Sequence, residues 1–336
     1  MKIVVDVFGG DNAPGALVEG AVLALERENG FSLLLCGDEE KTKAELRKFD
    51  YDASRVEILH APDVIGYDEA PTVAIKRKKD SSFVKALEAL RDKKADAFVS
   101  GGSTGAVLAG ATLIVRRLKG VKRPALAPLL PTRKGGHVLL IDCGANVDSK
   151  PSYLQQFAVM ADAYMKNAVG VEDPGIGLIN NGAEEEKGNE LTKAAYKLLK
   201  QTPVRFTGNC EARDILTGEF DAVVCDGFVG NVVLKYTEGL AAVLMGMIKD
   251  ELMADTRSKI GAALSRRAFM RVKKKMDYTE YGGAPLLGID GCVIKAHGSS
   301  NAKAFSAAIL QAKRFYEAGV NDAIARAVET LPSIED

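Results

Sequence analysis

The chain has 336 residues, enough for one large α/β domain or for two lobes around a sizeable core. Its 45 Lys and Arg balance 45 Asp and Glu, so no overall field favours nucleic acid as a partner. The five cysteines are far apart and show no CxxC or Cys/His spacing, which argues against zinc and against a disulfide framework. The N-terminus becomes acidic too early for a signal peptide, and no apolar run approaches the length of a membrane span. We therefore expect a cytoplasmic protein that needs no metal or cofactor.

Strands and helices alternate along the chain. Apolar runs predict strands at 2–8, 31–36, 56–59 and 95–100, and the same pattern returns at 137–146, 175–182, 204–209 and 221–225. Helices are expected at about 14–28, 39–49 and 71–92, the last one broken near Asp80, then from 101–105 to about 118, and in the last segment to about 330. This alternation predicts an α/β fold with a three-layer αβα arrangement, a mostly parallel sheet and helices on both faces. We expect residues 1–336 to form a single domain with two lobes around a cleft.

A small polar turn follows almost every predicted strand. Turn geometry and helix capping explain most of these residues, which read GGDN, GGSTG, DCGAN, NNG, GN and DGFVGN along the chain. Because parallel strands end at one edge of a sheet, the amides of Asn146, Asn181, Asn209 and Asn231 should face one crevice. Uncharged donors of this kind suit a phosphate or a developing oxyanion. The turn at 226–231 is the centre of the predicted site.

Residues 232–278 interrupt the alternation with two consecutive helices, separated by a break near Ala254-Asp255. They predict a helical hairpin that projects from the sheet. Its second helix carries eight Lys and Arg, including Arg266 and Arg267, and an apolar stripe at i, i+4 spacing. Packing on a partner subunit and contact with a membrane surface or an acidic partner both explain this pattern.

No catalytic nucleophile can be assembled from familiar motifs: P-loop, HExxH and GxGxxG patterns are absent, and GGSTG at 101–105 is interpreted as a turn that opens a helix. Of the three histidines, only His297 lies in a Gly/Ser loop. The absence fits a reaction in which the nucleophile is a substrate, such as inorganic phosphate attacking a thioester whose thiol has a pKa of about 8.5. Lys187, after three glutamates in 182–190, is the best charged candidate, although the start of a surface helix explains it equally well.

Seven segments resemble, in order, the bacterial phosphate acyltransferases of phospholipid synthesis. They are DVFGGDNAP (6–14), AIKRKKDSS (74–82), IDCGAN (141–146), GLINNGAEEEKGNE (177–190), FTGNCEARDI (206–215), DAVVCDGFVGNVVLK (221–235) and YGGAPLLG with KAHGSS (281–300). The resemblance implies transfer of a long-chain acyl group from acyl carrier protein to inorganic phosphate. The acyl phosphate would then pass to a downstream glycerol-3-phosphate acyltransferase. It also implies a homodimer with a fold like phosphotransacetylases and isocitrate-type dehydrogenases, with the hairpin helping to dimerise and its tip touching the membrane peripherally.

The same resemblance assigns the catalytic residues, and the binding residues are the other members of the predicted crevice. Lys187 and Asn231 match the positions expected to be catalytic. The residues expected to bind substrate or phosphate are Gly102, Ser103, Thr104, Asn146, Asn181, Asn209, Asp226 and His297. Ser103 departs from the family, in which most members carry Asn, and Val7-Phe8 replaces the usual Ala-Met.

Because an acidic carrier protein needs a basic docking face, two groups of cations compete for that role. One consists of Lys76, Arg77, Lys78 and Lys79, and the other is the basic helix of the hairpin. Three rival functions remain: a phosphotransacetylase that uses acyl-coenzyme A, a nicotinamide-dependent dehydrogenase of the related fold, and a non-catalytic scaffold at the membrane. The dehydrogenase would need an acidic metal cluster that the sequence lacks, and a scaffold has no need of a crevice of amides.

Overall fold

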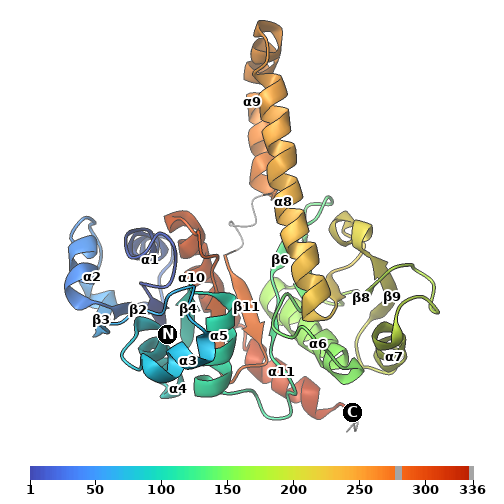
Figure 1. The fold of residues 1–336 in the computed structure, drawn as a ribbon, viewed down its shortest axis with the longest axis horizontal. Helices are drawn as coiled ribbons and strands as arrows, with labels where there is room; N and C mark the ends of the chain where they lie inside the picture. Colours follow the sequence, from blue (N-terminus) through green and yellow to red (C-terminus); the bar gives the residue numbers. More distant parts are fainter. Residues whose placement is uncertain (277–281, 333–336) are drawn as a thin grey trace.

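The structure is a computed structural model that describes residues 1–276 and 282–332, with the backbone alone for 273–276 (Figure 1). Two separate sheets organise the molecule, one in each lobe. The seven-stranded sheet has the order β3-β2-β1-β4-β12-β11-β5, and the five-stranded sheet has the order β6-β7-β10-β8-β9. The α/β class is confirmed, but the strands form two sheets rather than the one that the alternation predicted.

The first lobe is built on the seven-stranded sheet. Its strands are β1 (Lys2–Asp6), β2 (Ser32–Gly37), β3 (Val56–His60), β4 (Ala97–Ser100), β5 (Ala125–Leu126), β11 (Ala284–Leu287) and β12 (Cys292–Lys295). Its helices are α1 (Gly15–Arg27), α2 (Glu39–Leu46), α3 (Pro71–Arg77), α4 (Ser82–Arg91), α5 (Thr104–Gly110) and α10 (Ala302–Glu317). The last helix, α11 (Val320–Glu329), follows α10 and packs mainly on the second lobe. Alternate residues of β1 enter two cores, because Ile3 and Val5 join the cluster with α1 and α10 whereas Val4 joins the cluster with α4. Both faces of the sheet are therefore covered, as in other mainly parallel sheets.

The second lobe is built on the five-stranded sheet. Its strands are β6 (Leu129–Pro131), β7 (His137–Ile141), β8 (Ile176–Asn180), β9 (Phe206–Glu211) and β10 (Ala222–Val224), with helices α6 (Pro151–Tyr164) and α7 (Glu190–Leu199). All neighbouring strands are parallel except β6 against β7. The carboxyl ends of β7, β10 and β8 thus lie next to one another at one edge.

The predicted element positions are largely confirmed, with three corrections. Strands β5 and β6 were missed because prolines interrupt that segment, at Pro124, Pro128 and Pro131. Asn209 lies inside β9 rather than in the turn after it. The first hairpin helix begins at Gly227 and not at Val232, because Asp226 caps it.

The helical hairpin is confirmed, and it projects away from both sheets (Figure 1). It consists of α8 (Gly227–Leu252) and α9 (Thr256–Met276), with Asp255 at the turn accepting from the N–H groups of Arg257 and Ser258. Its predicted end at 277–278 lies outside the described residues. Contrary to the sequence expectation, α8 is long and apolar enough to cross a membrane by length and composition, and little of it is buried. The hairpin exposes large apolar side chains along both helices: Val232, Tyr236, Leu240, Val243, Leu244, Met247, Ile248, Ile260, Leu264, Met270 and Val272.

Candidate active site

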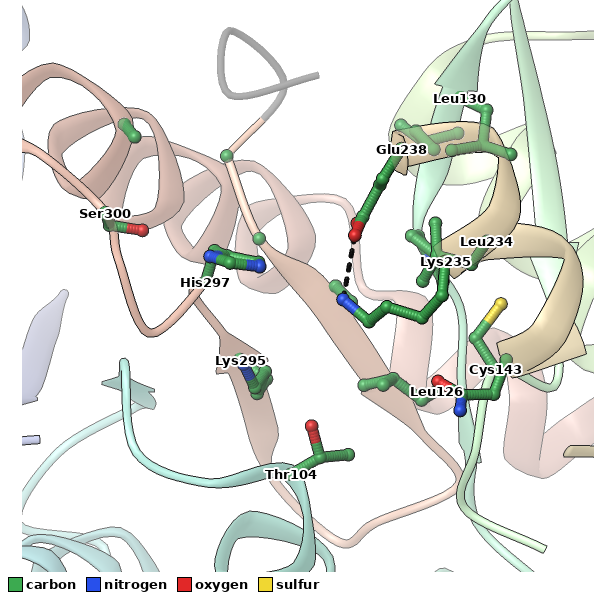
Figure 2. A pocket seen from close by; sticks show the side chains of 17 residues that line it. Thr104, Leu126, Leu130, Cys143, Leu234, Lys235, Glu238, Lys295, His297 and Ser300 are labelled. Carbon is green, nitrogen blue, oxygen red and sulfur yellow. Dashed lines mark hydrogen bonds and ion pairs between the residues drawn. The ribbon is translucent and has the colours of Figure 1, made fainter. Parts of the chain in front are cut away.

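A cleft between the lobes joins an apolar wall to a cationic end (Figure 2). It opens where α8 leaves the second sheet and where β12 ends in the first. The apolar wall includes Leu126, Leu129, Leu130, Cys143, Leu234, Ala284 and Ala304, and the polar end includes Thr104, Asn231, Lys235, Glu238, Lys295, His297 and Ser300. The cleft therefore offers an apolar surface and a charged end side by side.

Lys295 is placed by long-range strand pairing. It is the last residue of β12 and pairs with Ser100, the last residue of β4, so it lies beside the turn at 101–104. Its side chain is largely buried, and within residues 1–276 and 282–332 its Nζ forms no hydrogen bond or ion pair. Burial, reinforced by the charge of Lys235, lowers the pKa of Lys295 to about 8. A largely buried ammonium group without a partner in the described parts of the chain suits an anionic ligand.

Lys235 approaches the same space from the second lobe. It lies one turn of α8 after Asn231, and its Nζ is 2.8 Å from Oε2 of Glu238. Figure 2 shows the Lys235 ammonium extended into the cleft, on the side that faces His297 and Lys295. Two lysines from different lobes thus converge on one end of the cleft.

His297 lies in the loop that follows Lys295. Its Nδ1 is 2.8 Å from Oγ of Ser299 and accepts from the Ser299 N–H at 3.3 Å. Burial, with the charges of Lys295 and Lys235, lowers the pKa of His297. The ring is therefore neutral at physiological pH, with Nδ1 as acceptor and the proton on Nε2. The side chain of Asn12 fixes this loop by donating to the carbonyl oxygens of Ser299 and Ser300.

A buried carboxylate, that of Asp6, fixes the turn at 101–104 through hydrogen bonds. Asp6 accepts from the hydroxyls of Ser82 at 2.6 Å and Ser100 at 2.8 Å, and Oγ of Ser100 accepts from the Gly102 N–H. Burial raises the pKa of Asp6. A side chain at Gly101 would meet the Gly9 carbonyl, since its Cβ would lie 2.5 Å from that oxygen. The turn therefore presents Thr104 to the cleft in a fixed position.

A second buried carboxylate supports the start of α8. Asp142 accepts from the N–H groups of Leu126 and Asn146 and from the Asn146 side chain, and burial raises its pKa to about 6. Gly230 packs against the Asp142 carbonyl so closely that no side chain would fit there. This packing positions Asn231 beside Gly144 with its amide at the cleft.

Comparison with known proteins identifies the family. The chain matches the family described as fatty acid synthesis protein over residues 1–323. It is 52% identical over 329 residues to a phosphate acyltransferase of Clostridium novyi (strain NT), covering 98% of this chain and 99% of that protein. A phosphate acyltransferase of Clostridium botulinum (strain Loch Maree / Type A3) is 55% identical over 317 residues, 94% of each chain. The chain belongs to the phosphate acyltransferase family. It is an acyltransferase of fatty acid and phospholipid synthesis.

Solved structures support the fold of this phosphate acyltransferase. EutD phosphotransacetylase from Staphylococcus aureus superposes with a TM-score of 0.58 at 17% identity, covering 98% of this chain and 94% of that one. The 4-hydroxythreonine-4-phosphate dehydrogenase from Klebsiella pneumoniae gives 0.53 at 14% identity, covering 94% and 99%. The expected likeness to phosphotransacetylases and dehydrogenases is confirmed at the level of the fold.

The structure brings together only part of the site predicted for this phosphate acyltransferase. Thr104, Asn231 and His297 line the cleft. Lys187 and Asn181 are exposed on the loop after β8, outside the cleft lining but beside the strand that leads into α8. No group of three or more His, Cys, Asp or Glu that could hold a metal occurs in the described ranges.

The other predicted binding residues have internal partners. Asn146 is buried and donates to the Pro124 carbonyl, and Asn209 donates to the Glu184 carbonyl. Asp226 caps α8 by accepting from the Val229 N–H, and Ser103 caps α5 by accepting from the Ala106 N–H. Gly102 and Ser103 line a small neighbouring cavity next to Asp6.

The predicted docking residues are mostly exposed. Lys76 and Arg77 in α3 and Lys79 after it are exposed, whereas Lys78 pairs with Glu69 at 2.6 Å. Arg266 and Arg267 are exposed on α9, in the projecting hairpin.

Three residues of the cleft were missed from the sequence. Lys235 and Glu238 follow Asn231 at i+4 and i+7 on one face of a helix, a spacing that could have revealed them. Lys295 ends an otherwise apolar strand directly before the His297 loop, which is a weaker signal.

Proposed function

We propose that this enzyme transfers a long-chain acyl group from acyl carrier protein to inorganic phosphate and releases an acyl phosphate. The observation that carries the proposal is the cleft itself, in which leucines adjoin two lysines and a neutral histidine. The apolar wall suits the acyl chain, and the cationic end suits phosphate. The phosphate acyltransferase name of the relatives supports phosphate as the acceptor.

The reaction needs little proton transfer. A phosphate oxygen attacks the thioester carbonyl carbon, a C–O bond forms, and the carbonyl oxygen becomes an oxyanion. The C–S bond then breaks, and the thiolate leaves with the bonding electrons and takes a proton from water. The amide of Asn231 and the Nε2–H of His297 would stabilise the oxyanion by hydrogen bonding. Lys187 remains a proposed catalytic residue, because β8 and β10 are neighbouring strands and their carboxyl ends lie about 5 Å apart.

The exposed cations and the apolar side chains of the hairpin support the proposed partners. An acidic carrier protein would dock on Lys76, Arg77 and Lys79 or on the basic α9 with Arg266 and Arg267. The exposed apolar side chains of α8 and α9 would pack in a homodimer and meet a membrane surface peripherally. The enzyme would then act in the cytoplasm and pass acyl phosphate to a glycerol-3-phosphate acyltransferase at the membrane.

The test is a direct assay of the product. Purified protein is incubated with a long-chain acyl-(acyl carrier protein) and radiolabelled phosphate, and both labelled acyl phosphate and free carrier thiol are measured. Formation of both in equal amounts is expected. Activity with acyl-coenzyme A alone would replace the proposal with a phosphotransacetylase activity. No product with either donor, from folded protein, would overturn it.

A further inference from the structure

We propose that Lys235 and Lys295 hold the phosphate between them, one from each lobe, and that Glu238 is the counter-ion that phosphate displaces from Lys235. The inference rests on the proposed function, because it assigns the acceptor to one end of the same cleft. It makes Glu238 a residue that tunes phosphate affinity without touching the acyl donor.

The charges at the cationic end favour a divalent anion. Glu238 is the one carboxylate among the described residues that line the cleft; it pairs with Lys235, and its charge also acts on Lys295. Asp11, which acts on Lys295 from outside the lining, is the other anion nearby. The Lys295 ammonium forms no ion pair or hydrogen bond in the described parts of the chain, although its side chain is largely buried. A buried charge of this kind is costly unless an anion satisfies it, and phosphate supplies several acceptor oxygens.

Phosphate can replace Glu238 as the partner of Lys235 at little cost in free energy. The Lys235 side chain is 55% exposed, and exposed pairs at i, i+3 contribute little to stability. Phosphate forms charge-assisted hydrogen bonds as a carboxylate does, and it offers more acceptor oxygens, so it can replace Glu238 as the partner of Lys235. Lys235 can therefore leave Glu238 for phosphate without loss to the fold. It lies one helical turn from Asn231, the proposed donor to the thioester carbonyl oxygen.

The experiment measures the KM for phosphate at a saturating concentration of the acyl donor. Lys235→Ala and Lys295→Ala should each raise this KM on the order of 10- to 100-fold, with a much smaller change in the KM for the donor. Glu238→Gln should lower the KM for phosphate about two- to five-fold, because the competing carboxylate is gone. Lys193→Ala and Glu172→Gln, at exposed positions far from the cleft, are the matched controls and should change neither constant.

A second readout needs no turnover. Inorganic phosphate alone should raise the melting temperature of the native enzyme and of Glu238→Gln, and should have little effect on the two lysine variants. Suppose that the native enzyme makes acyl phosphate. If Glu238→Gln then binds phosphate more weakly, or if the lysine variants bind it normally, the proposed phosphate site at Lys235 and Lys295 is refuted and the proposed function stands. If native enzyme makes no acyl phosphate, the proposed function fails, and the phosphate-dependent melting shift still decides whether the lysines bind phosphate.

Discussion

Replacing Lys295 with methionine should make the protein more stable while it weakens phosphate binding. Methionine keeps most of the length of the buried side chain and removes its charge. Burial lowers the pKa of Lys295 from 10.5 to about 8. Since one pKa unit corresponds to about 1.4 kcal/mol, the charged form is about 3 kcal/mol less favourable in the folded protein than in the unfolded chain. This value is the upper bound of the expected gain, and we expect about 1–3 kcal/mol.

The gain should depend on pH in a defined direction. Because the folded pKa lies below the unfolded value, the cost of the charge is fully present below about pH 8 and disappears as the pH rises to about 10.5. The advantage of Lys295→Met in the free energy of unfolding should therefore be largest near about pH 7 and smaller by about 2 kcal/mol near about pH 9.5.

Urea unfolding in phosphate-free buffer at both pH values measures this difference. Lys193→Met, which removes an exposed lysine from α7, should leave the unfolding free energy nearly unchanged at both pH values. Added phosphate should stabilise the native enzyme and not Lys295→Met. A loss of stability in Lys295→Met at about pH 7, or a gain independent of pH, would refute the reasoning.

Three further predictions concern the rest of the molecule. Asn231→Ala and Lys187→Ala should each lower kcat on the order of 100- to 1000-fold with an unchanged circular dichroism spectrum, since both side chains are exposed; near-normal rates would remove them from the mechanism. Asp142→Asn should lower the free energy of unfolding by about 2–3 kcal/mol, because a buried acceptor of several N–H groups becomes partly a donor; urea unfolding with no such loss would contradict this role. Leu264→Glu should change stability by less than about 0.5 kcal/mol, because the residue is 83% exposed, and should reduce sedimentation with anionic vesicles; undiminished sedimentation would remove this side chain from the proposed membrane contact.

Local signals in the sequence were sufficient for most elements of the fold. The strand 221–225 is recognisable because its residues are apolar and β-branched, and Asp226 and Gly227 then end it. The hairpin is recognisable because two helices follow each other without a strand. The division into two sheets could not be predicted, because strand pairing joins distant segments, as when β12 enters between β4 and β11.

The same distinction between local and long-range signals applies to the site. Asn231 was predicted from a local turn. Lys235 and Glu238 were not predicted, although their helical spacing from Asn231 could have revealed them. Lys295 enters the site only because β12 pairs with β4, which no local pattern records. The cleft lysine whose pKa burial lowers is therefore the residue that sequence reasoning could least identify.

The turns that the sequence assigned to binding have a second role in the fold. In each lobe a buried aspartate at a strand end, Asp6 or Asp142, accepts hydrogen bonds from the groups that shape the turn facing the cleft. Two glycines near these aspartates, Gly101 and Gly230, let the backbone of another segment approach closely. Oxyanion stabilisation depends on donors that are already in place when charge develops. The buried carboxylates supply this fixed geometry, so their replacement should lower the rate of acyl transfer even though neither carboxylate reaches the cleft.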